Sequence, residues 1–145
     1  MSAPTDDYQS TINKALDYVR ELCTDGGKLS LPKLDDYQQV TLDLAVSTAE
    51  LQCARNYLDY SESQGEIEQK LSASFSAETL RNIRNRLVRM PSDFGLTQEE
   101  LSQLNTEASD ELLSTASLAA LGRHIVNNDG DLGDRGLDED KIIIA

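Results

Sequence analysis

The sequence has 145 residues, enough for one domain with a hydrophobic core. It contains 26 acidic residues against 13 lysines and arginines, which gives a formal net charge of −13. This balance argues against nonspecific binding to nucleic acid or to an anionic membrane, because both need a basic surface. Residues 1–10 resemble no secretory signal, and the sequence has no run of 18 apolar residues. We therefore expect a cytoplasmic protein that binds neither nucleic acid nor membrane.

The spacing of the apolar residues predicts an all-α fold, a helical bundle of about five helices. The first helix is expected from about residue 5 to residue 24. Its apolar side chains recur at steps of three and four residues, as one face of an amphipathic helix requires: Tyr8, Ile12, Ala15, Val19 and Leu22. The sequence Asp25-Gly26-Gly27 is expected to end this helix, because glycine tolerates the left-handed backbone.

The second predicted helix, at about residues 35–63, carries two apolar stripes on opposite sides. One stripe consists of Tyr37, Val40, Leu44, Leu51 and Leu58, and the other of Leu42, Val46, Ala49, Cys53, Tyr57 and Tyr60. Two opposed stripes predict a helix that is covered on both sides, so we expect it to be the long central helix of the bundle. Arg55 falls on the first stripe and is expected to form an ion pair or to reach solvent.

A third helix is predicted at about residues 66–90, and its apolar positions change sides midway. The pattern fits a helix that contacts two neighbours in succession, and it also fits a helix that is interrupted near Ser76. Pro91 ends the segment. Thr97 and Glu100 then form a capping box that opens a short helix, and residues 110–126 predict a helix of small residues suited to close packing.

The domain organisation follows from this pattern. We expect residues 1–126 to form the helical domain and residues 127–137 an acidic Gly/Asp linker. Residues 138–145 would begin a further helix that ends on its most apolar residues. We therefore expect the chain to be a fragment that continues into a downstream domain.

The two cysteines, Cys23 and Cys53, match no metal-binding or redox spacing. Both lie within helical patterns, so we expect buried, reduced thiols. The sequence does not exclude a disulfide between them, and nothing in the sequence requires one.

Four arginines of the third helix form the first candidate site, an anion-binding or partner-binding face: Arg81, Arg84, Arg86 and Arg89. Guanidinium groups bind phosphates and carboxylates through paired hydrogen bonds. The alternative, which we favour, is a solvated face that pairs with the surrounding acids. The absence of aromatic residues between the arginines argues against a nucleic-acid surface.

A weaker candidate is a calcium site in the acidic tract. Its ligands would be Asn127, Asp129, Asp131 and Asp138, at loop positions 1, 3, 5 and 12 of an EF-hand. Leu132 stands where the loop needs glycine, so we favour a solvated linker. The single histidine, His124, belongs to no catalytic triad or metal motif, and we predict no catalytic, cofactor-binding or established metal-binding residue in this chain.

Three segments resemble the helical N-terminal extension of methylsuccinyl-CoA dehydrogenase-like enzymes, which are flavin-dependent acyl-CoA dehydrogenases. These segments read LDLAVSTAELQCARNYLDYSESQG, MPSDFGLT and LAALGRHIVNNDGDLGDRGLDEDKIII. The resemblance implies that the parent protein uses FAD and a glutamate base to oxidise a branched or dicarboxylic acyl-CoA, such as methylsuccinyl-CoA, to its enoyl-CoA. It also implies that the flavin and base positions lie downstream of Ala145.

The functional expectation is therefore a noncatalytic accessory domain that packs on the downstream dehydrogenase domain, with a homo-oligomeric contact as a further option. The alternative is a free-standing acidic helical adaptor that engages a basic protein partner through residues 99–140. A calcium-responsive module is a third option.

Overall fold

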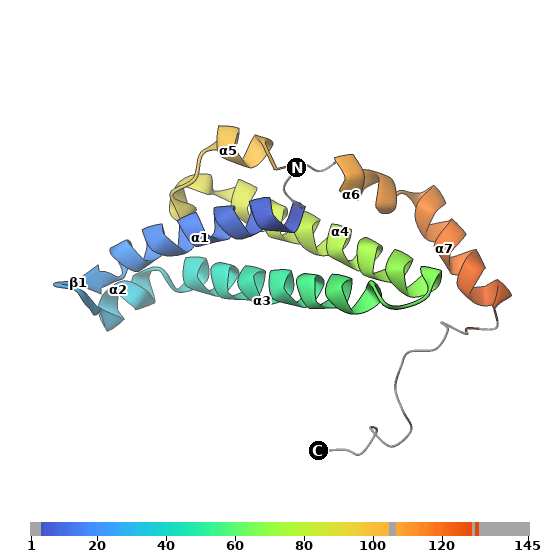
Figure 1. The fold of residues 1–145 in the computed structure, drawn as a ribbon. Coiled ribbons are helices and arrows are strands. Elements are labelled where there is room, and N and C mark those ends of the chain that lie inside the picture. The colour runs from blue at the N-terminus through green and yellow to red at the C-terminus, as the bar shows by residue number, and fades with distance from the viewer. Residues whose placement is uncertain (1–3, 105–106, 129, 131–145) are drawn as a thin grey trace, which may run out of the picture.

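The structure is a computed structural model that describes residues 4–104, 107–128 and 130. Within these ranges the fold is all-α, as predicted, with a single two-stranded hairpin as the exception (Figure 1). The elements are α1 (Pro4–Leu22), β1 (Thr24–Asp25), β2 (Lys28–Leu29), α2 (Leu31–Asp36), α3 (Gln38–Ser61), α4 (Glu66–Arg89), the 3-10 helix η1 (Pro91–Phe94), α5 (Gln98–Ser102), α6 (Glu107–Leu112) and α7 (Thr115–Asn127).

The three long helices α1, α3 and α4 pack side by side and enclose the hydrophobic core (Figure 1). The predicted face of α1 is buried, apart from Leu22, which is half-buried. Residues of η1 and α5, and the two leucines that follow η1 and α5, close one side of the core. The core residues are Tyr8, Ile12, Ala15, Val19, Cys23, Leu44, Leu51, Leu80, Ile83, Leu87, Phe94, Leu96, Leu101 and Leu104.

A short hairpin and a short helix stand where the sequence predicted only a turn. Gly26 and Gly27 have φ angles of 55° and 78°, the left-handed values that a two-residue hairpin turn needs. The helix predicted over residues 35–63 begins later, because the backbone leaves helical geometry at Tyr37 (φ −105°, ψ 21°). This residue separates α2 from α3, so the predicted boundary was wrong.

The central helix of the bundle is α4 rather than α3. It runs without interruption past Ser76 and contacts α3, α5, α6 and α7, so the first of the two sequence-based alternatives is correct. The helix α3 packs on α1 and α4 through one side only. Its second apolar stripe is largely exposed, including Leu42 and Tyr60, so the prediction that this helix is covered on both sides was wrong within the described residues.

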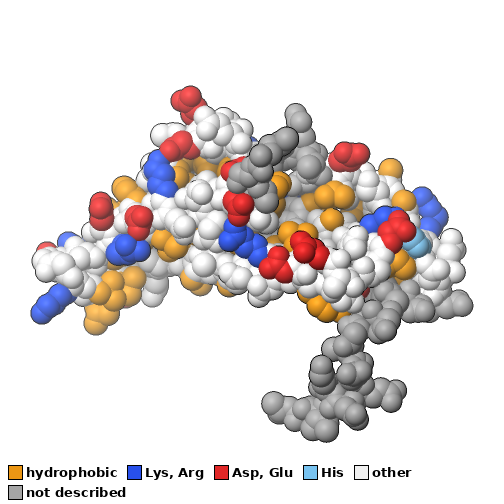
Figure 2. All heavy atoms as spheres, in the orientation of Figure 1, with side chains coloured by type: hydrophobic (Ala, Val, Ile, Leu, Met, Phe, Trp, Pro, Cys, Tyr) orange, Lys and Arg blue, Asp and Glu red, His pale blue; other side chains and the backbone are white. Residues whose placement is uncertain are grey.

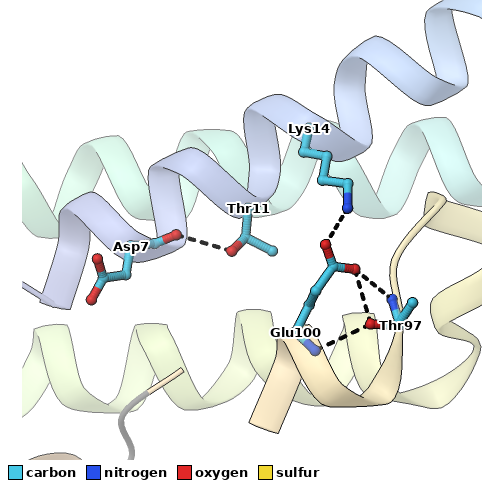
Figure 3. Close-up of polar contacts among 5 residues, drawn as sticks. All are labelled: Asp7, Thr11, Lys14, Thr97 and Glu100. Atoms are coloured by element: carbon cyan, nitrogen blue, oxygen red, sulfur yellow. Dashed lines mark hydrogen bonds and ion pairs between the residues drawn. The ribbon is translucent and has the colours of Figure 1, made fainter. Parts of the chain in front are cut away.

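The capping box predicted at Thr97 and Glu100 is present and fastens α5 to α1 (Figure 3). The backbone N–H of Glu100 donates to Thr97 Oγ1 at 3.2 Å, and the backbone N–H of Thr97 donates to Glu100 Oε2 at 2.8 Å. Lys14 of α1 donates to the other carboxylate oxygen of Glu100. The Lys14 ammonium, followed by the Thr97 backbone, holds the pKa of Glu100 below its ordinary value.

The segment 110–126 does not form one helix. It divides into α6 and α7 at Ser114, whose hydroxyl accepts a hydrogen bond from the Ser117 backbone N–H at 3.2 Å and so caps α7. None of the side chains of α7 is buried, in contrast to the close packing that its small residues predicted. Across the part of the chain described here, no helix is long and apolar enough to cross a membrane.

Both cysteines are free thiols. Cys23 is buried at the end of α1, as predicted, but Cys53 is exposed, so its predicted burial was wrong. Cys53 belongs to the second apolar stripe of α3, which is largely exposed. The predicted linker over residues 127–137 begins at the last residue of α7, Asn127, and most of it lies outside the described residues, as does segment 138–145.

Candidate interaction surface

The four arginines of α4 do not converge on one point. Arg86 donates two hydrogen bonds to the carboxylate of Glu50 on α3, from Nη1 to Oε2 at 2.6 Å and from Nη2 to Oε1 at 2.8 Å. Arg89 donates to Oδ2 of Asp43, also on α3, at 2.8 Å. Two of the four guanidinium groups therefore fasten α4 to α3, and an anion at this helix would compete with both carboxylates.

The other two arginines lie elsewhere on α4. Arg84 is half-buried and its Nε–H has no hydrogen-bond partner. It lies near Tyr8, whose burial in the core raises the pKa of its hydroxyl to about 12; the Arg84 charge opposes this shift, and Asp110 adds to it. Arg81 is exposed to solvent. The cluster thus divides into an interhelical clamp and two separate cations, and anion binding stays a hypothesis.

Most of the proposed calcium ligands lie outside the described residues. Asn127 is the last residue of α7, whereas Asp129, Asp131 and Asp138 are not described. Among the described residues, no group of three or more histidine, cysteine or acidic side chains could hold a metal ion. His124 lies in the last turn of α7.

A polar groove of about 840 Å³ opens beyond the N-terminus of α1, between α3 and α4. Its lining includes Ser61 and Ser72, whose hydroxyl oxygens lie 2.6 Å apart. Each hydroxyl oxygen also lies 2.9 Å from a backbone carbonyl of its own helix. Arg55 bonds to Asp6 and to Gln9 at the edge of this groove, as its place on the apolar stripe led us to expect. The two serine hydroxyls bond to each other and to backbone carbonyls, and none of these partners is a base that could activate a serine.

A buried carboxylate lies near the same end of the bundle. Glu68 accepts a hydrogen bond from the Tyr57 hydroxyl at 2.9 Å through Oε1, whereas its Oε2 is buried without a partner. The Tyr57 ring packs edge-on against Phe75, with ring centres 5.7 Å apart, and stacks with Tyr60 at 6.4 Å. Glu68 could not be singled out from the sequence, because a lone glutamate in a helix carries no signal of burial.

The outward side of α3 forms a surface that we call the neutral face. Leu42 is 57% exposed and Tyr60 38% exposed, and Cys53 is also exposed among them. In a helix of 3.6 residues per turn, nine residues project opposite the buried side of α3. The neutral face consists of Gln38, Leu42, Ala45, Val46, Ala49, Gln52, Cys53, Asn56 and Tyr60.

No residue of the neutral face is charged, although α3 contains four charged residues at its flanks. Asp43 and Glu50 bind the arginines of α4, Arg55 binds Asp6 of α1, and Asp59 lines the polar groove. In Figure 2 the lower margin of the molecule, where α3 lies, shows hydrophobic and uncharged polar side chains. An exposed helix face without charge is unusual in a chain with 27% charged residues, and such a surface is typical of an interaction site.

An apolar notch of about 280 Å³ lies next to the neutral face and shares Ala45 with it. Cys23 and Leu44 contribute to its lining, together with Leu29 of the hairpin. Leu29 is 63% exposed and Leu31, at the start of α2, is 68% exposed. Hydrophobic side chains gather at this end of the molecule, where α2 lies in Figure 2, so apolar surface continues from the neutral face towards the hairpin.

Comparison with known proteins gives no family assignment: no family model matches the chain, and no curated protein matches it. The class of protein, an all-α helical bundle, is therefore assigned from the structure alone.

Proposed function

We propose that the chain is a noncatalytic helical interaction domain that serves an FAD-dependent acyl-CoA dehydrogenase. The neutral face of α3 supports the first part of this proposal, because it is an uncharged, partly apolar surface on a strongly charged protein. The resemblance of the sequence to the helical extension of methylsuccinyl-CoA dehydrogenase-like enzymes supports the second part. No residue of this chain is proposed to bind the flavin or the acyl-CoA.

The proposed role is structural. The core of the domain rests on aliphatic contacts and on the clamp between α3 and α4, so the domain can present α3 as a rigid surface. A rigid helix presents its side chains in one arrangement and loses little conformational entropy when a partner binds. We propose that this surface joins the domain to its surroundings in the larger enzyme, while the chemistry takes place on other residues.

The experiment that tests this proposal is the purification of the native polypeptide that contains this sequence. We expect a mass well above the 16.0 kDa of these 145 residues and a flavin absorption band that bleaches when an acyl-CoA is added, because the flavin accepts the hydride. Replacing His124 with glutamine should leave the bleaching rate unchanged. A colourless native protein of 16.0 kDa would contradict the dehydrogenase assignment.

A second candidate function is an acidic adaptor for a basic protein. It is favoured by the net charge of −13. The sequence places its binding region at residues 99–140, part of which lies outside the described residues, and the polar groove adds the acidic groups Asp59 and Glu62. Binding of a basic partner there should weaken steeply as salt is added, since salt screens attraction between opposite charges. Binding through the neutral face should lack this loss, so a salt series distinguishes the two functions.

A further inference from the structure

We propose that the neutral face is a self-association surface, on which α3 of one chain packs antiparallel against α3 of a second copy. This inference rests on the part of the proposed function that treats the neutral face as an interaction surface, and it names the partner. It does not depend on the assignment to a dehydrogenase.

The charge distribution favours a second copy as the occupant. A basic partner would find no carboxylate on the neutral face, because Asp43 and Glu50 are bound to arginines at its flank. Two copies that met through an acidic surface would place like charges against each other, and each copy carries a formal charge of −13. A face without charged groups lets two such chains make contact while their carboxylates stay at the rim.

The residue sizes along α3 favour close packing of two helices. Ala45, Ala49 and Cys53 follow one another at four-residue spacing, so they form a row of small side chains along the helix. Rows at this spacing create the ridges and grooves through which helices interlock, and small residues allow the two backbones to approach closely. Leu42 and Tyr60 lie towards opposite ends of the row and provide the larger apolar contacts.

The centre of the face determines the position of the symmetry axis. The neutral face extends from Gln38 to Tyr60, so its middle residue is Ala49. A twofold axis beside Ala49 overlays the whole face on itself when the helices are antiparallel. Leu42 then lies at the level of Asn56 of the second copy and Val46 at the level of Gln52, whereas the small residues Ala45 and Cys53 lie at the same level as each other.

The size of the face predicts a weak dimer. A helix of 24 residues is about 36 Å long and roughly 10 Å wide, so the contact buries roughly 700 Å² in total when both copies are counted. This area is below the roughly 1,200 Å² of a stable standard interface. The apolar notch and the exposed Leu29 and Leu31 add surface at each end of the antiparallel pair. We therefore expect dimers that form reversibly with rising concentration.

The primary test is sedimentation equilibrium of the complete 145-residue chain over a concentration series. We expect the mass to rise from 16.0 kDa towards twice that value. Ala49→Glu should weaken dimerisation at least tenfold, because it places two carboxylates beside the twofold axis. Ala116→Glu makes the same chemical change at an exposed position of α7 and should leave dimerisation unchanged. Circular dichroism confirms that each variant is folded.

Two further measurements test the partner and the register. Mixing the Ala49→Glu and Ala49→Lys chains should restore the dimer, because opposite charges then meet at the axis. In a Cys53→Ser background, Ala49→Cys should form an interchain disulfide under mild oxidation, whereas Cys53 in the natural chain should not, since antiparallel packing separates the two Cys53 positions by about 12 Å along the helix.

Salt provides an independent criterion. Added salt should strengthen the dimer, because it screens repulsion between two chains of like charge. A chain that stays at 16.0 kDa throughout, or an Ala49→Glu variant that dimerises like the natural chain, would overturn the proposal. Failure of the dehydrogenase assignment is distinguishable, since it appears in the mass and the flavin band of the native polypeptide rather than in the association of this chain.

Discussion

Gly95 shows how one residue fixes the path between α4 and α5. It caps η1 with φ 63°, a left-handed value at which a side chain is strained, and its N–H donates to the Ser92 carbonyl at 3.1 Å. The Tyr18 ring of α1 packs over its Cα, so that a Cβ at this position would overlap the ring. Gly95 is therefore needed both for its backbone angle and for the close approach of α1.

Substitution of this glycine gives the prediction at the residue scale. Gly95→Ala should lower the free energy of unfolding by about 2 kcal/mol, since it combines a strained φ with displacement of Tyr18. Gly122→Ala is the matched control, because this glycine lies inside α7 with nothing near its missing side chain, and it should not lower the free energy of unfolding. Urea denaturation measures both, and equal effects of the two substitutions would refute the interpretation of Gly95.

At the scale of elements, the clamp between α3 and α4 holds the surface-presenting helix in place. Arg86 and Glu50 form two parallel hydrogen bonds and are both only partly exposed, whereas Arg89 is mostly exposed and makes a single bond to Asp43. Paired bonds are stronger and more directional than a single exposed ion pair. The Glu50 hydrogen bonds accordingly raise the pKa of the Arg86 guanidinium.

A comparison of the two ion pairs tests this ranking. A double-mutant cycle with Arg86→Met and Glu50→Gln should give a coupling free energy of about 1 kcal/mol, and the equivalent cycle on Arg89 and Asp43 less than about 0.5 kcal/mol. Urea is the denaturant of choice, because guanidinium chloride would screen the charges. A larger coupling in the Arg89 pair would show that exposure does not decide the strength of these contacts.

The elements also show what the sequence could predict. Local patterns predicted the buried face of α1 and the capping box of α5, since each depends on local spacing or local hydrogen bonds, but they left open whether α4 is continuous past Ser76. Periodicity failed on α3, because an apolar stripe has the same spacing whether a neighbouring helix covers it or solvent does. Part of the buried surface was also missed, because apolar periodicity does not identify buried polar residues. Four serines of α3 and α4 are buried: Ser47, Ser61, Ser72 and Ser76.

At the scale of the whole molecule, stability is distributed unevenly. The large buried side chains gather where α1, α3 and α4 lie together, and residues such as Leu51 and Ile83 are fully buried there. The helix α7 contains no buried residue and rests on α4 and α6 through half-buried side chains such as Leu121. The neutral face of α3 belongs to the stable part, which suits a surface that must keep its shape in order to bind.

This distribution predicts two levels of protection against amide hydrogen exchange. Amides of α7 should exchange through local opening, well before those of residues 44–54 and 80–87, which should exchange only on global unfolding. Two Leu→Ala variants distinguish local opening of α7 from global unfolding. Leu121→Ala should lower protection in α7 alone, whereas Leu51→Ala removes a fully buried side chain and should lower protection of the core amides by about 2–5 kcal/mol. If α7 instead exchanged as slowly as the core, or if Leu121→Ala weakened the core amides equally, the molecule would unfold as one cooperative unit, and its stability would not be concentrated beneath the neutral face.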